Sequence, residues 1–266
     1  MSDQLAAVIL GVVQGLTEFL PVSSTAHLIL VSDALKLDPE KFGLSFDVAL
    51  HLGTALAVLL YFARTWIGLL VDVLRGRWRI PLAIVAGTIP AAVAGVLFET
   101  AVSTTLRSVL YIVAGLLAGS AVFVFAERAG AQRTRMERIT IGDAVVIGAA
   151  QAIALLPGIS RSGITISAGL LRGLERGDST RFAFLLATPI ILGAGLKTLL
   201  DARKLAGLTA QLDIVAIGFA VSFISGLAAV AFMVLYLRTH SMSVFVVYRV
   251  VLALAIIVAL AFGVIA

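Results

Sequence analysis

Two short polar stretches carry most of the residues that could do chemistry in this chain. The first, residues 14–27, reads QGLTEFLPVSSTAH, and the second, residues 157–165, reads PGISRSGIT. Each contains a proline, then a cluster of hydroxyl side chains and a cation or potential cation, between apolar segments. A carboxylate, an imidazole, hydroxyls and a guanidinium can together bind an anion and move a proton.

In the first stretch, Gln14 and Glu18 are four residues apart and share one face of a helix. A carboxylate in a membrane segment costs at least about 2.5 kcal/mol, so it rarely occurs without a partner or a function. Glu18 is therefore the strongest candidate for a functional residue in this half. The alternative is an interfacial glutamate near a frayed helix end.

His27 follows Ser24 by three residues, so both again lie on one helical face. A histidine can act as general base near neutral pH, although a single histidine is more often simply packed. The hydroxyls of Ser23, Ser24 and Thr25 can equally cap a helix. We expect at most one of them to be a nucleophile, and we favour Ser24.

In the second stretch, Arg161 cannot be neutralised by deprotonation, so its burial requires an anionic partner or ligand. Gly158, Ser160, Ser162 and Thr165 surround it at the predicted start of a helix, where free N–H groups and the helix dipole attract phosphate. These residues predict an oxyanion-binding site. The alternative is a structural salt bridge between Arg161 and the carboxylate of the first stretch.

The composition is that of an integral membrane protein. Of 266 residues, 61% are hydrophobic and 13% charged, and the mean hydropathy is +1.10. Apolar runs of about 20 residues, enough to cross a bilayer, recur over the whole length, so we expect a single membrane domain. The net charge of +5 reflects arginine clusters in short loops, which indicates cytoplasmic loops and not nucleic-acid binding. The chain has no cysteine, which excludes thiol chemistry.

The order of segments repeats. A broken pair of short apolar segments surrounds each polar stretch, and three longer spans follow each pair. The predicted spans are residues 46–63, 80–98 and 109–126 in the first half, and 182–200, 214–237 and 244–266 in the second. Gly11-Val-Val-Gln14 before the first stretch matches Gly148-Ala-Ala-Gln151 before the second. We therefore expect internal repeats over about 1–135 and 138–266.

Each half has an odd number of spans, three, so the second repeat enters the membrane in the opposite orientation to the first. The arginine-rich segments 64–79 and 128–138 then fall on one side, which the charge bias makes the cytoplasmic side. The two broken pairs would enter the membrane as re-entrant helix pairs from opposite sides and meet near its midplane, where inverted repeats place their substrate sites. Asp47 and His51, four apart at the start of a span, are expected to form a local pair at the entrance.

The chain resembles the bacitracin-resistance family of undecaprenyl-diphosphate phosphatases. That family is marked by an (E/Q)xxxE segment with a following PVSS-x-x-H, and by PGxSRSxxT. Here these motifs are residues 14–18, 21–27 and 157–165, and the resemblance covers essentially the whole chain. It implies an all-α inverted-repeat membrane fold with six transmembrane helices and two re-entrant pairs.

The resemblance also implies a hydrolase that removes the terminal phosphate of a C55 isoprenyl diphosphate. The product, undecaprenyl phosphate, is the lipid carrier of peptidoglycan synthesis in the bacterial inner membrane. The family's site opens to the outer side and involves a divalent cation, Mg²⁺ or Ca²⁺. Glu18 and Gln14 would hold that cation, although many relatives have a second glutamate where this chain has Gln14.

From these features we expect Arg161, Ser160, Ser162, Thr165 and Gly158 to bind the diphosphate, with Ser23 and Thr25 beside it. His27 would activate either Ser24 or a water molecule. The alternative function is a lipid flippase or a proton-coupled transporter that uses the same inverted-repeat site, with Glu18 as the proton site. A homo-oligomer is compatible with the sequence.

Overall fold

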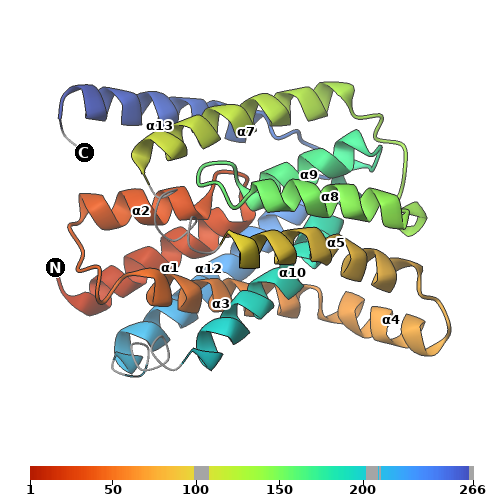
Figure 1. Cartoon of the computed structure of the whole chain (residues 1–266), viewed down its shortest axis with the longest axis horizontal. Coiled ribbons are helices and arrows are strands. Elements are labelled where there is room, and N and C mark those ends of the chain that lie inside the picture. The colour runs from red at the N-terminus through yellow and green to blue at the C-terminus, as the bar shows by residue number, and fades with distance from the viewer. Residues whose placement is uncertain (99–107, 202–208, 210, 264–266) are drawn as a thin grey trace.

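The protein is all-helical throughout the residues that the computed structural model describes, which are 1–98, 108–201, 209 and 211–263 (Figure 1). The first half contains α1 (Asp3–Phe19), α2 (Ser24–Ala34), α3 (Leu44–Tyr61), α4 (Ala63–Leu74), α5 (Arg79–Leu97) and α7 (Val109–Ala129). The 3₁₀ turn η2 (Met136–Arg138) leads to the second half, with α8 (Ile141–Ile153), α9 (Arg161–Leu171), α10 (Arg176–Leu200), α12 (Leu212–Tyr236) and α13 (Ser243–Ala261).

Six of these helices are long and apolar enough to cross a membrane, and they confirm the six predicted spans. They are α3, α5, α7, α10, α12 and α13. Large apolar side chains on their outer faces are exposed, as a lipid environment requires. Helix α10 begins at Arg176 and not at the predicted residue 182, because hydropathy does not detect its charged first turn. The predicted end of the last span, Ala266, lies outside the described residues.

The prediction of a simple loop over residues 64–79 is wrong. Residues Ala63–Leu74 form helix α4, with Ile67, Leu70 and Leu74 exposed and Leu69 buried. These apolar residues recur at helical spacing, which is the pattern of an amphipathic helix. The arginines that flank this helix are typical of a charged loop, which is why the segment was predicted to be one.

The four remaining helices form two hairpins, α1–α2 and α8–α9, whose connecting turns meet near the centre of the molecule (Figure 1). Helix α1 packs against α12, and α8 packs against α5. Both crossings depend on glycine. A Cβ on Gly11 would lie 2.9 Å from the carbonyl oxygen of Gly218, and a Cβ on Gly148 would lie 1.8 Å from that of Gly87. In each crossing a hairpin helix of one half packs on a spanning helix of the other half, and this equivalence supports the proposed internal repeat.

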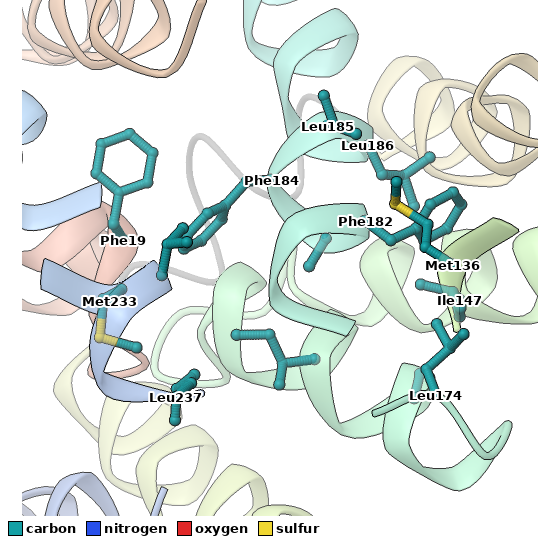
Figure 2. Close-up of a cluster of buried hydrophobic side chains, with 14 of the residues drawn as sticks. Phe19, Met136, Ile147, Leu174, Phe182, Phe184, Leu185, Leu186, Met233 and Leu237 are labelled. Atoms are coloured by element: carbon teal, nitrogen blue, oxygen red, sulfur yellow. The ribbon is translucent and has the colours of Figure 1, made fainter. Parts of the chain in front are cut away.

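The main hydrophobic core surrounds α10 and holds the two hairpins in register. Phe182 and Leu186 point toward Ile147 of α8, and Phe184 points the other way, toward Phe19 at the end of α1 (Figure 2). The rings of Phe19 and Phe184 meet edge to face with centroids 5.3 Å apart. Helix α10 thus fixes the end of one hairpin relative to the other through close apolar packing, and the hydroxyl of its Ser179 donates to the carbonyl of Ile166 in α9 at 2.7 Å.

Candidate active site

The two connecting turns have the same unusual backbone. Ser23, the N-cap of α2, and Ser160, the N-cap of α9, both have φ of 76°. Positive φ costs a residue with a Cβ about 1 kcal/mol or more, and such strain persists where the surrounding structure fixes it. Gln14 and Gln151 each lie nine residues before one of these serines, so the two turns occupy corresponding places in the two halves.

The turns bond directly to each other. The backbone N–H of Gly158 donates to the hydroxyl of Ser23 at 3.1 Å, and the hydroxyl of Ser162 donates to the carbonyl of Leu20 at 3.2 Å. Gly158 has φ of 90°, and a Cβ there would lie 2.3 Å from the carbonyl oxygen of Ile112, so only glycine fits. Ser23, Ser162 and Gly158 therefore join the two halves.

Arg249 of α13 donates hydrogen bonds to both turns of this junction. Its side chain is fully buried and donates to the carbonyl of Pro21 in the first turn at 3.3 Å and to that of Gly158 in the second at 2.7 Å. Further donor bonds reach Ser120 Oγ and two carbonyls of α7. The guanidinium also lies 4.7 Å from the centroid of the Phe123 ring. Our sequence reasoning missed Arg249, although a lone arginine within an apolar span is itself a signal.

Glu18 lies at the centre of the site, with its side chain 4% exposed. The hydroxyl of Ser24 donates to its Oε2 at 2.6 Å, and the amide of Gln14 donates to the same atom at 3.1 Å. Its Oε1 lies 3.7 Å from Nη1 of Arg161, and its Oε2 lies 3.4 Å from Nε2 of His51. The structure therefore brings the carboxylate of one hairpin and the guanidinium of the other together.

The Arg161 side chain is 27% exposed, and its Nη1 is buried without a hydrogen-bond acceptor. An ion pair of 3.7 Å is too long for a hydrogen bond, so this nitrogen can still receive an anionic ligand. Ser160 accepts from the N–H of Gly163, which caps α9. Thr165 donates to the carbonyl of Arg161 at 2.6 Å, which turns its hydroxyl back onto its own helix.

A small polar cavity of about 20 Å³ lies between the hairpins. It is lined by Thr17, Glu18, Ser23, Ser24, Thr25, Ala154, Leu156, Pro157, Ser160 and Arg161. Of the predicted site residues, Gly158, Ser162 and Thr165 are absent from this lining, and Gln14 and His27 are as well. The space holds about one water, so a larger anion requires the hairpins or the Arg161 side chain to move.

His27 does not face the cavity. Its Nδ1 lies 2.8 Å from the carbonyl of Ser23, and its Nε2 lies 2.7 Å from the hydroxyl of Tyr248, whose ring stacks on the imidazole. Both ring nitrogens are therefore engaged outside the Ser24–Glu18 pair. His51 of α3, which we expected to form only a local pair, is the histidine nearest the carboxylate.

The side chains of this site can supply only some of the ligands that a divalent cation needs. In the described part of the chain, no three His, Cys, Asp or Glu side chains gather around one point. Glu18 is a single carboxylate, but Oε1 of the fully buried Gln14 has no hydrogen-bond partner and is an oxygen of the kind that Mg²⁺ and Ca²⁺ accept. Mg²⁺ commonly binds through one or two carboxylates and completes its shell with substrate phosphate and water. The residues fit a cation held in that way.

The fold and site define a helical membrane protein with a buried carboxylate, hydroxyl and guanidinium site between two helix hairpins. Comparison with known proteins identifies the family. The family model described as bacitracin resistance protein BacA matches residues 7–255, so the chain belongs to this family.

Among curated relatives, the undecaprenyl-diphosphatase of Desulforudis audaxviator is 46% identical, over 94% of this chain and 95% of the relative. The protein of the same name from Rubrobacter xylanophilus is 45% identical, over 95% of this chain and 97% of its own length. That from Geotalea daltonii is 43% identical, over 98% of this chain and the whole of the relative. The resemblance seen in the motifs is thereby confirmed.

Replacing Arg249 by methionine tests its part in the junction. The change leaves the buried carbonyl oxygens of Pro21 and Gly158 without their Arg249 donor, and each unsatisfied buried acceptor costs about 1–3 kcal/mol. We expect a clearly lower melting temperature for the purified protein in detergent. Arg238→Met, at an exposed position just before α13, is the matched control and should melt like wild type. Equal melting temperatures for the two variants would contradict the role given to Arg249.

Proposed function

We propose that this protein is an undecaprenyl-diphosphatase, which hydrolyses the terminal phosphate of undecaprenyl diphosphate and releases undecaprenyl phosphate. One observation carries the proposal beyond the family: Arg161, whose Nη1 has no hydrogen-bond acceptor, and the Ser24–Glu18 pair border one cavity. This combination can bind a phosphoryl group and attack it. The relatives described above are named for this reaction and not for transport, so a flippase or transporter function is not proposed.

Arg161 is the main phosphate ligand in this proposal. A guanidinium offers a fork of donors to phosphate oxygens, and Arg161 stands in the first turn of α9, where the helix dipole adds to the attraction. Ser160 and Ser23 border the same cavity and supply hydroxyls near the bound group. In this proposal Gly158, Ser162 and Thr165 shape the turn that presents Arg161, because their polar groups bond within the protein.

Ser24 is the nucleophile in this proposal, with Glu18 as proton acceptor. As Ser24 Oγ forms its bond to the terminal phosphorus, its proton moves along the 2.6 Å hydrogen bond to Glu18 Oε2. The anhydride bond breaks, and undecaprenyl phosphate leaves with the bridging oxygen. Water then attacks the phosphoserine and releases inorganic phosphate, and Ser24 recovers a proton. The geometry favours Glu18 over His27 as acceptor, because both nitrogens of His27 are bonded elsewhere.

A divalent cation fits beside these groups, held by Glu18 and by Gln14 through its amide oxygen. When bound, such an ion supplies neutralisation of diphosphate charge and polarises the terminal phosphoryl group. The hydroxyl of Ser24 fixes the carboxylate by donating to Oε2.

We also propose the placement of the protein in the bacterial cytoplasmic membrane. The apolar helices make it a multi-pass membrane protein, in contact with lipid. With arginine-rich segments on the cytoplasmic side, the α1–α2 turn is reached from the outer side and the α8–α9 turn from the inner side. From the family resemblance we also propose that the site opens outward, with the isoprenyl tail between spans.

Release of inorganic phosphate from C55 isoprenyl diphosphate by the purified protein tests the function. Arg161→Ala should lower turnover about 100-fold or more, since it removes a charge-stabilising donor, and Arg161→Lys should restore part of it. Glu18→Gln should be similarly impaired, and chelator should abolish release. Arg172→Ala, an exposed arginine at the end of α9, is the control. Absence of phosphate release from the wild-type protein would refute the function, and normal turnover in Arg161→Ala would refute the site.

The nucleophile is tested at residue 24. Ser24→Ala should lose about 10³-fold or more in turnover, and acid quenching of the wild-type reaction should leave a phosphate on Ser24 that mass spectrometry detects. Ser108→Ala, at an exposed serine that caps no helix through its side chain, is the matched control. Near-normal turnover in Ser24→Ala, without a trapped phosphoserine, would instead favour direct attack by water.

A further inference from the structure

His51 lies beside Glu18 and belongs to neither hairpin. It belongs to α3, a membrane-spanning helix outside both hairpins, and its side chain is 19% exposed. Its Nε2 lies 3.4 Å from Oε2 of Glu18. The proposed reaction gives this histidine no role.

The other ring nitrogen of His51 determines what Nε2 can do. Nδ1 lies 2.7 Å from the backbone carbonyl oxygen of Asp47, and a carbonyl only accepts, so Nδ1 carries the hydrogen. In the neutral ring Nε2 then presents a lone pair toward the carboxylate oxygen of Glu18. Two acceptors that face each other at 3.4 Å require a positive species between them, either a proton, which makes an imidazolium–carboxylate ion pair, or a metal ion.

His27 provides an internal comparison. Its Nδ1 bonds in the same way to the carbonyl four residues earlier, that of Ser23. Its Nε2, however, faces the hydroxyl of Tyr248 at 2.7 Å, and a hydroxyl can donate. The lone pair of His27 is therefore satisfied within the protein, whereas that of His51 faces another acceptor.

Gln14 supplies a third group. Its Nε2 donates to Oε2 of Glu18 at 3.1 Å, while its Oε1 is buried without a partner. A half-turn of the amide exchanges these two atoms at no cost in shape and places an oxygen 3.1 Å from the carboxylate oxygen. Separations of about 3 to 3.5 Å between donor atoms are those found around a metal ion with bonds of about 2.1 Å.

We propose that His51, together with Glu18 and Gln14, forms the protein's side of a divalent-cation site. His51 binds through Nε2, and its Nδ1–H is held by a backbone carbonyl, as is usual for metal-ligating histidines. The inference rests on the proposed function in one respect, since the substrate's diphosphate and water complete the coordination. An imidazole ligand shifts the preference of such a site away from Ca²⁺, which favours oxygen, toward divalent transition-metal ions.

Pulsed electron paramagnetic resonance of bound Mn²⁺ tests this directly, because an imidazole nitrogen on the metal produces a ¹⁴N coupling. The chain has three histidines, so the protein is purified without a histidine tag. Wild type should bind Mn²⁺ with the ¹⁴N coupling. His51→Gln, which offers an amide oxygen, should lose the coupling, and His51→Leu should bind Mn²⁺ about tenfold or more weakly. His240→Gln, an exposed histidine between α12 and α13, should resemble wild type.

A second variant keeps the test decisive if His51→Gln does not fold. With both His27 and His240 replaced by Gln, His51 is the sole histidine, and the ¹⁴N coupling must persist. Absence of Mn²⁺ binding by wild type, or a coupling that survives His51→Gln, overturns the proposal. Mn²⁺ binding is measured without substrate, so a protein that binds through His51 but releases no phosphate would refute the proposed function and leave the metal site standing.

Discussion

The structure depends on the hydrogen bonds that join two irregular turns from opposite halves of the chain. A turn leaves N–H and C=O groups without helical partners, and their burial costs free energy unless other protein groups satisfy them. Here the turns satisfy each other: Gly158 donates to Ser23, and Ser162 donates to Leu20. Arg249 then reaches a carbonyl of each turn. Neither turn would be stable in this form without the other.

The same junction places the chemistry. Ser23 and Ser160 cap the helices that begin with Ser24 and Arg161. Fixing the caps therefore fixes the nucleophile of one hairpin and the phosphate ligand of the other. Glu18 lies between them, and its burial beside Arg161 is favourable only because the two charges compensate each other. The long Glu18–Arg161 separation and the free Arg161 nitrogen leave that compensation incomplete, which suits a site whose ligand carries negative charge.

Much of the fold follows from the sequence because its signals are local. The six spans are long apolar runs, and hydropathy locates them within a few residues except at the charged start of α10. The proximity of Glu18 and Arg161 also followed, since each charge in an apolar segment requires a partner. Helix α4 was not predicted, because its amphipathic pattern lies among arginines that are typical of a cytoplasmic loop.

The rest of the site depends on contacts between distant segments. Arg249 and Tyr248 lie in the last span, and nothing in their local sequence indicates that Arg249 reaches the turn before α2 or that Tyr248 reaches His27 of α2. His51 looked like the local partner of Asp47, and its backbone bond to Asp47 is indeed local, but the orientation of Nε2 is set by the packing of α3 against α1. The expectation for His27 was drawn from its spacing to Ser24, whereas Tyr248 determines where that ring points.

The central claim is that the two turns touch, and cysteine cross-linking in a chain without native cysteines tests it most directly. The variant carries Ser23→Cys and Pro157→Cys, together with a protease site inserted near residue 131. It is first treated by mild oxidation or with a short thiol cross-linker and is then cleaved at that site. The two halves should stay joined. Leu16→Cys with Ile153→Cys, exposed on α1 and α8, should separate. Halves that separate equally for both pairs would contradict the account.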